Sequence, residues 1–133
     1  MFTTSSADDG QLRSRPMTLQ EVDDDNNLWF FASRSAPIAA DIMSNQKINL
    51  GFSNPDKSVY VSVSATARIV EDRMKMKELF SPAVKAWFPK GLEDPDLMLI
   101  QCEGQAADYW DTPSSKVVQL SAFAKSMLTG ESP

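Results

Sequence analysis

The sequence predicts a mainly β protein (α+β), a six-stranded antiparallel barrel with short flanking helices. In the segment 59–69, apolar and polar residues alternate as they do in a strand that buries one face. Other short apolar segments are separated by turn residues, and the helical segments are too few to cover both faces of a parallel sheet. A chain of 133 residues holds one such core and not two, so we expect a single domain over 1–133.

The elements are expected in the order strand, strand, helix, two strands, two helices, two strands and a helix. Strands are assigned from alternating or continuous apolar residues, and helices from apolar residues three or four positions apart. The strands are expected at 12–19, 28–32, 48–52, 59–69, 97–102 and 106–110. The helices are expected at 35–45, 72–79, 81–88 and 117–128, and the polar ends 3–10 and 129–133 are assigned no element.

In the first half of the chain, turn residues and caps set the boundaries. The acidic and polar residues 21–27 separate the apolar segments 12–19 and 28–32, which indicates two strands joined by a hairpin. Ser35 and Pro37 then predict the start of a helix, since Ser caps free amides and Pro is tolerated in the first turn.

In the second half, short helices are predicted to connect strands. Asp72 and Ser81 are expected to cap two consecutive helices, and Pro89 with Gly91 ends the second of them. The last helix is predicted from apolar residues at helical spacing up to Gly130.

The composition excludes several classes of chemistry. With no His and one Cys, Cys102, the chain forms no His-dependent triad, no His-bearing zinc site and no intrachain disulfide. Its five glycines are too far apart for a dinucleotide fingerprint or a phosphate loop. A net charge of -5 with scattered basic residues argues against nucleic acid, and no apolar segment has the length of a membrane span. We therefore expect a cytoplasmic protein with no metal, nucleic-acid or membrane partner, which either binds a ligand or uses an organic cofactor.

Two features suit a planar, phosphorylated ligand. Arg13 and Arg15 leave the same face of a strand, where paired guanidinium groups can hold a phosphate; two solvated arginines on an edge strand explain the spacing as well. The consecutive Trp29, Phe30 and Phe31 cannot all face one core, so at least one needs another partner. A dimer interface, a planar ligand, a second sheet or a covering helix would each serve.

Six segments of the chain form an ordered series: GQLRSRPMT, LWFFASRS, INLGFSNP, YVSVSATARIVEDR, KAWFPKGLEDPDLMLI and AADYWD. In this order they resemble the general stress protein branch of the pyridoxamine phosphate oxidase-like, FMN-binding split-barrel family. The match runs from about Met1 to Gly130. The resemblance implies a six-stranded split barrel, a homodimer, and FMN held at the dimer interface. By the same resemblance, we expect the chain to lack the helix that precedes the first strand in relatives.

The resemblance also implies cofactor-binding residues. Arg15 is similar to the strand arginine that meets the flavin, Arg13 is its neighbour, and Trp110 resembles an aromatic that reaches FMN across the dimer interface. The full implied set is Arg13, Arg15, Pro16, Met17, Thr18, Phe31, Ala32, Ser33, Arg34, Tyr60, Ser62 and Trp110. No catalytic residue is assigned.

The chain departs from the family where the phosphate is expected. Ala36, Pro37 and Ile38 stand where relatives have Lys or Arg. We therefore expect arginines and free amides near Ser35 to hold the phosphate, and a lysine introduced at position 38 to tighten FMN binding. Ala65 replaces a frequent Gly, and the absence of His argues against oxidation of pyridoxamine phosphate.

Two functions remain open. The first is a homodimeric FMN-binding flavoprotein of the general stress protein type, an FMN-dependent oxidoreductase or electron-transfer protein of unknown substrate. The alternative is a non-catalytic dimeric barrel that acts as a cofactor carrier or stress-related interaction module with weak or no FMN. The segment 36–38 favours the alternative, and the absorbance spectrum of the purified protein separates the two.

Overall fold

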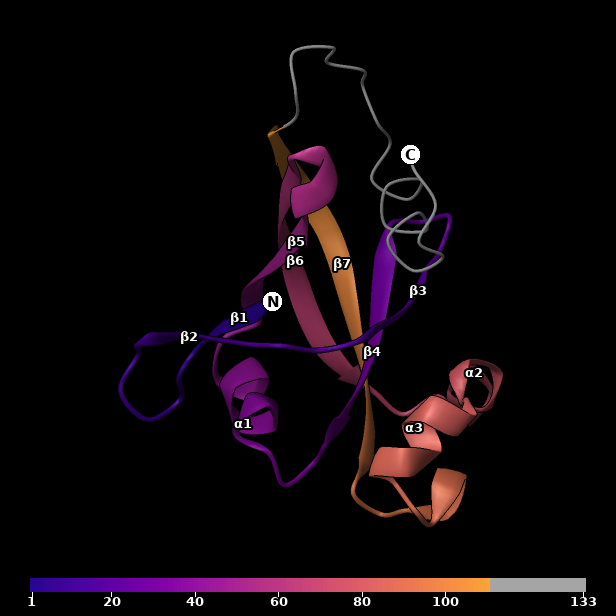
Figure 1. Cartoon of the computed structure of the whole chain (residues 1–133). Coiled ribbons are helices and arrows are strands. Elements are labelled where there is room, and N and C mark those ends of the chain that lie inside the picture. Colours follow the sequence, from indigo (N-terminus) through magenta and orange to yellow (C-terminus); the bar gives the residue numbers. More distant parts are fainter. Residues whose placement is uncertain (111–133) are drawn as a thin grey trace.

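The computed structural model describes residues 1–110, which form one antiparallel sheet with helices at its ends (Figure 1). The strands are β1 (Phe2–Ser5), β2 (Leu12–Arg15), β3 (Leu19–Val22), β4 (Asn27–Ser33), β5 (Lys47–Asn54), β6 (Val59–Val70) and β7 (Leu97–Trp110). The helices are α1 (Pro37–Ser44), α2 (Arg73–Leu79) and α3 (Pro82–Trp87), with short 3-10 turns η1 (Pro55–Lys57) and η2 (Gly91–Glu93).

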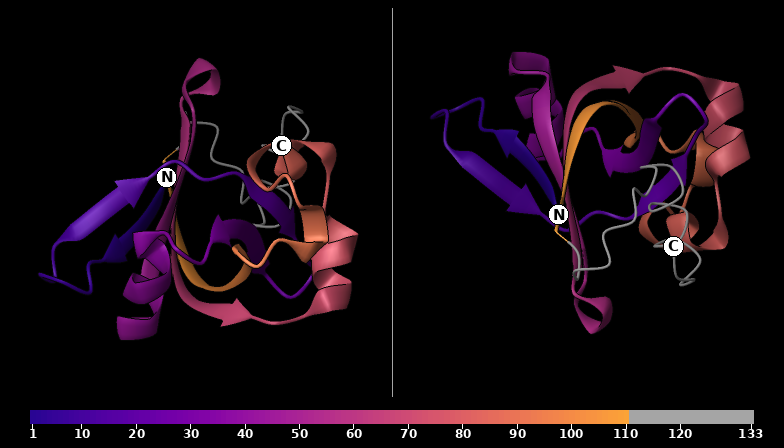
Figure 2. Two further views of the ribbon diagram at one scale, coloured as in Figure 1. Left: turned by 90° about the horizontal axis from the view of Figure 1, so that it is seen from below. Right: turned by 90° about the horizontal axis from the view of Figure 1, so that it is seen from above.

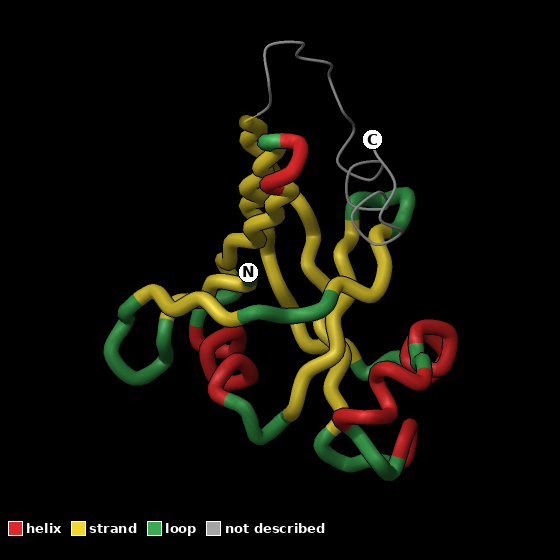
Figure 3. Tube along the Cα trace, in the orientation of Figure 1, coloured by secondary structure: helices red, strands yellow, loops and turns green. Residues whose placement is uncertain are grey.

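The sheet has the strand order β2-β1-β5-β6-β7-β4-β3, so β2 and β3 are its two edges. Residues 16–18 lead from one edge to the other, and this connection crosses in front of the sheet (Figures 1 and 3). Figure 2 shows the β1–β2 hairpin and the α2–α3 pair at opposite ends of the molecule. This architecture confirms the predicted mainly β split barrel with short flanking helices, with seven strands in the described part in place of six.

The strand boundaries differ from the expectation at two places. The segment 12–19 is divided at Pro16 into β2 and β3, because proline has no N–H to donate to a ladder. The two halves pair with different partners, β2 with β1 and β3 with β4, so the predicted hairpin holds only for β3. The segments 97–102 and 106–110 form the single strand β7. The residues between them fit into the pairing of β7 with β6 through a register shift between Ser64 and Ala65.

The additional strand, β1, lies largely in the N-terminal segment that was assigned no element. Phe2 and Thr4 face inward and are buried, whereas Thr3 and Ser5 are more exposed. Phe2 pairs with Arg15 on one side and with Leu50 on the other. Four residues are too few to show a period in sequence, so this strand is recognisable only from the neighbours that it pairs with.

The three described helices lie within the predicted ranges. The Asp72 and Ser81 side chains accept the amides of Lys75 and Val84, which confirms both predicted caps. Ser35 does not cap α1, whose N-cap is Ala36 without a side-chain hydrogen bond. The predicted helix 117–128 lies outside the described residues.

The core consists of two clusters, and the three consecutive aromatic residues divide between them. Phe30 packs inside the sheet with Phe2 and the buried face of α1. Trp29 faces the opposite way and packs beneath α2 and α3. Phe31 is partly buried, with its ring edge-to-face against Phe80. Trp29 is therefore covered by α2 and α3. A covering helix was one of the alternatives that the sequence left open.

Candidate functional site

A pocket of about 400 Å³ opens between the 16–18 connection, β4 and α3. A cavity of this size suits a small organic ligand. Its walls are mainly apolar, and Arg15 is the one ionisable residue that lines it in the described part of the chain. The lining residues are Arg15, Pro16, Met17, Thr18, Gln20, Phe31, Ala32, Ser33, Ala36, Ile38, Ala83, Val84, Trp87 and Phe88.

The α3 wall of the pocket is anchored in the second core cluster. Val84 and Phe88 are buried there, and Ser81 caps the helix. Trp87 lies on the same short helix, yet 83% of its surface is exposed. The backbone of Trp87 is therefore held by its neighbours, while its ring stands free at the pocket.

Arg15 enters the pocket from the end of β2. Its Nη1 donates to the Thr4 hydroxyl at 2.9 Å and lies 3.5 Å from the Phe2 carbonyl oxygen. Its Nη2 lies 3.4 Å from Oδ2 of Asp41, a residue of α1 that is 4% exposed. This guanidinium group is therefore already part of an ion pair.

The structure separates the residues implied by the resemblance into groups. Those that line the pocket are Arg15, Pro16, Met17, Thr18, Phe31, Ala32 and Ser33. Arg13 does not line it and pairs with the exposed Asp9 at 2.7 Å. Arg34 pairs with Glu71 at the surface.

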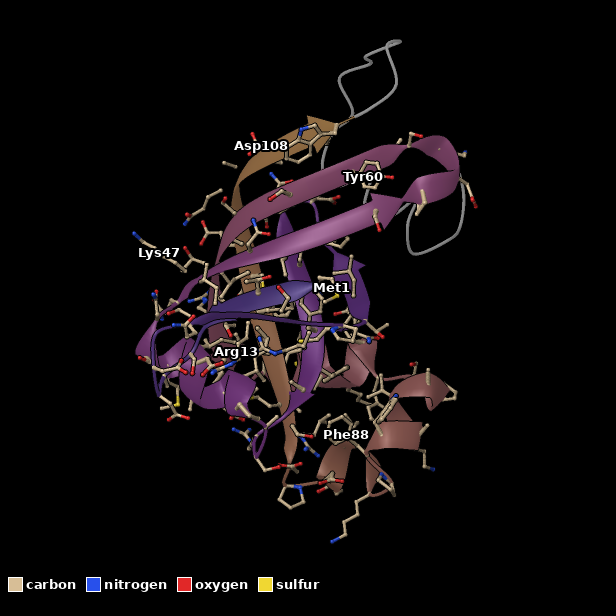
Figure 4. All side chains as sticks on the ribbon, turned by 60° about the vertical axis from the view of Figure 1, so that its left-hand side comes forward. Met1, Arg13, Lys47, Tyr60, Phe88 and Asp108 are labelled. Atoms are coloured by element: carbon tan, nitrogen blue, oxygen red, sulfur yellow. The ribbon has the colours of Figure 1, made fainter. Side chains whose placement is uncertain are left out.

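The remaining group, Tyr60, Ser62 and Trp110, lies on β6 and β7. Tyr60 and Trp110 are register partners and are 43% and 57% exposed, and Ser62 accepts a hydrogen bond from Asn49 at 2.8 Å. Figure 4 shows Tyr60 at the opposite end of the molecule from Phe88, which lines the pocket. Within one chain this group does not reach the pocket.

The Ser35 amide, which we expected to be free for the phosphate, already has a partner. The Ser35 amide donates to Oδ1 of Asp96 at 2.9 Å, and the Ser35 hydroxyl lies 3.2 Å from Oδ2. The hydrogen bond that the Ser35 backbone N–H donates, together with further hydrogen bonds and the charge of Arg34, lowers the pKa of Asp96. The Ser35 amide is thus bound to a carboxylate and is not free for a phosphate. Ile38 is 3% exposed within the core, so a lysine there would not form the partly exposed ion pair that we expected.

Five lining residues escaped the sequence analysis: Gln20, Ala83, Val84, Trp87 and Phe88. Ala36 and Ile38 also line the pocket, and the sequence analysis named them only as positions where the basic residues of relatives are replaced. Trp87 and Phe88 are adjacent and both are large and apolar, so the sequence alone does not say which of them is buried. Only the docking of α3 beside β4 turns one of them toward solvent at the pocket. No local signal distinguishes the exposed aromatic from the buried one.

The pocket fits one part of FMN and not the other. Flat apolar walls and the N–H groups of Arg15 suit an aromatic ring system with carbonyl acceptors. A phosphate needs cations or free amides, and the described lining residues offer no cation besides the paired Arg15.

Other sites receive no support from the described part of the chain. No group of three His, Cys, Asp or Glu residues in 1–110 is arranged to hold a metal ion. No helix within the same residues is long and apolar enough to cross a membrane. Cys102 is buried, and burial raises the pKa of its thiol well above the ordinary value, so it is not a nucleophile.

The family model described as pyridoxamine 5'-phosphate oxidase like matches residues 1–133. The chain belongs to this family. Its relative Protein bli-3 of Neurospora crassa is 30% identical over 140 residues, which take in 98% of this chain and 67% of the relative. The predicted family is confirmed.

Solved structures share the fold of this pyridoxamine 5'-phosphate oxidase-like chain. The general stress FMN/FAD binding protein of Xanthomonas citri is 28% identical, with a TM-score of 0.73 over 90% of this chain and 84% of the other. A Clostridium acetobutylicum protein related to general stress protein 26 is 21% identical, with a TM-score of 0.75 over 84% and 78% of the two chains.

Proposed function

We propose that this chain is an FMN-binding flavoprotein of the general stress protein type, which works as a homodimer. The observation that carries the proposal is the pocket itself, whose walls contain Arg15, the connection 16–18 and the β4 residues 31–33 that the resemblance implies. The relative from Xanthomonas citri, described as an FMN/FAD binding protein, supports a flavin. Bound FMN would supply hydride or electron transfer, while the chain binds and orients it.

The ring system is the part of FMN that the pocket of one chain would hold. Phe31 and Ala32 form an apolar wall on β4, and Trp87 offers an aromatic face on the other side. Arg15 supplies N–H donors between them. Removal of these apolar surfaces from water would provide most of the binding free energy, and the donors would fix the orientation of the ring.

A second copy of the chain would complete the site. Tyr60 and Trp110 leave a large aromatic surface exposed on the β6–β7 ribbon, which one chain does not cover. Among the described residues, the pocket has no cation besides the paired Arg15 to bind a phosphate. In the proposed dimer, the β6–β7 ribbon of one copy would lie against the open pocket of the other.

Flavin binding is tested by titrating the purified, flavin-free protein with FMN, FAD and riboflavin, followed by flavin fluorescence. We expect saturable binding of FMN with one flavin per chain. Absence of binding by all three compounds would contradict the proposal. It would favour the alternative of a flavin-free interaction module, which is supported by the lack of a second cation among the lining residues of the segment 1–110.

The dimer is tested by sedimentation of the wild type and of Trp110→Asp. We expect the wild type to sediment as a dimer at micromolar concentration and the variant to dissociate, because a carboxylate would be buried against the partner without a counter-ion. Met74→Asp is the matched control, since Met74 is 83% exposed on α2. A monomeric wild type would contradict the prediction.

Trp87→Ala is expected to weaken flavin binding by about 1 kcal/mol, the usual contribution of an aromatic contact. Its unfolding free energy should stay within about 0.5 kcal/mol of the wild type, because an exposed side chain contributes little to stability. Flavin titration and chemical denaturation measure the two effects. Trp87→Phe should retain most of the affinity; equal affinity of Trp87→Ala and the wild type would remove Trp87 from the site.

A further inference from the structure

Asp41 is a buried carboxylate that the sequence analysis did not single out. It lies on α1 and is 4% exposed. Its Oδ2 accepts the Thr4 hydroxyl at 2.9 Å, and its Oδ1 accepts the Ala7 amide at 2.9 Å. Nη2 of Arg15 lies 3.4 Å from Oδ2. Because burial of a charge without partners costs several kcal/mol, this carboxylate is stable only with such contacts around it.

These contacts hold Arg15 from one side. Asp41 contacts Nη2, and Thr4 accepts from Nη1 while its own hydroxyl donates to Asp41, so the three side chains form a closed triangle. The Nε–H and one Nη2 N–H of Arg15 have no partner within residues 1–110. A guanidinium group is planar, so fixing one edge also fixes the direction in which the remaining donors point.

Asp41 also changes the charge of the pocket. Arg15 is the one ionisable residue that lines the pocket within residues 1–110, and the negative charge of Asp41 lies beside it. The pair has no net charge, so its attraction for a phosphate is much weaker than that of a free arginine. Arg15 can still bind neutral carbonyl and ring-nitrogen acceptors, because a hydrogen bond to such an acceptor depends on the direction of the N–H group.

We propose that Asp41 is a positioning residue, which orients Arg15 toward the uncharged ring system of the ligand and prevents it from acting as a phosphate site. This inference rests on the proposed flavin-binding function. On this inference, the pocket of one chain selects for the flavin ring. The phosphate is bound by groups outside that pocket.

A purely structural role of Asp41 is the competing explanation. The carboxylate ties β1 and the turn after it to α1, and its loss would loosen that packing whether or not Arg15 contacts a ligand. A double-mutant cycle separates the two roles, since a positioning residue acts only when the residue that it positions is present.

The experiment compares the wild type, Asp41→Asn, Arg15→Met and the double variant, each titrated with FMN and with riboflavin. We expect Asp41→Asn to lower the affinity for riboflavin about tenfold, the effect of a misplaced charged hydrogen-bond donor, and the affinity for FMN by a smaller factor, because the unpaired charge of Arg15 then attracts the phosphate. In the Arg15→Met background, Asp41→Asn should have no further effect. Glu93→Gln is the matched control, because it removes a carboxylate from the ion pair of Arg73, and neither residue lines the pocket.

Thr4→Val provides a second variant in case Asp41→Asn does not fold. Thr4 is fully buried, and valine preserves its shape while removing the hydroxyl that joins Asp41 to Arg15. We expect a smaller loss of affinity for both flavins, which again disappears in the Arg15→Met background.

Three results would overturn the inference: unchanged affinity in Asp41→Asn, an equal loss in the Arg15→Met background, or a loss confined to FMN. The last would place the phosphate at Arg15. In each of these cases the wild type still binds flavin, and the proposed function stands. If the wild type binds neither FMN nor riboflavin, the proposed function fails and the inference fails with it.

Discussion

Replacement of Phe2 by alanine is expected to lower the unfolding free energy by about 3–5 kcal/mol, the range for a large aromatic removed from a core. Phe2 is 1% exposed, and its ring lies edge-to-face against Phe30 with the centroids 5.1 Å apart. Its strand also joins β2 to the rest of the sheet. The cavity would therefore form where an edge hairpin is attached.

Chemical denaturation measures this loss, and Phe52→Ala is the matched control. Phe52 is only half-buried on the neighbouring β5, so its truncation should cost less. If Phe2→Ala cost no more than Phe52→Ala, β1 would not belong to the cooperative core.

Replacement of Ile38 by lysine is expected to lower the unfolding free energy by about 3–5 kcal/mol, through the loss of apolar burial and the desolvation of an ammonium group. Ile38 is 3% exposed on α1. The nearby Asp41 already accepts hydrogen bonds from Thr4, Ala7 and Arg15, so the new ammonium group would compete for an occupied carboxylate. This result would reverse the expectation from sequence, in which a lysine at this position tightens FMN binding.

Ala36→Lys is the control for this substitution. Ala36 is only half-buried and lines the pocket, so a lysine there can extend toward solvent. We expect it to fold normally and to tighten FMN over riboflavin by up to about 1 kcal/mol, the value of a partly exposed ion pair. Thermal unfolding and flavin titration test both variants. A stable Ile38→Lys with tighter FMN binding would contradict the argument.

Local patterns predicted much of the fold. The alternation over 59–69 became β6, because one strand buries alternate residues whatever its neighbours are. Asp72 and Ser81 became helix caps, because a cap needs only the amides two or three residues ahead. The pocket residues on the segments 15–18 and 31–33 were found through the resemblance and not through any periodicity.

By itself, the sequence determined the elements whose stabilising contacts are local, together with the family to which their order corresponds. The tertiary structure decided which side of β4 receives Trp29 and which receives Phe30, because that depends on helices that are distant in sequence. It also placed Trp87 at the pocket and Asp41 beside Arg15, which lies 26 positions earlier in the chain. Such contacts join strands and helices through the core. They cannot be predicted from local sequence patterns, because the two residues in each contact are far apart in the chain.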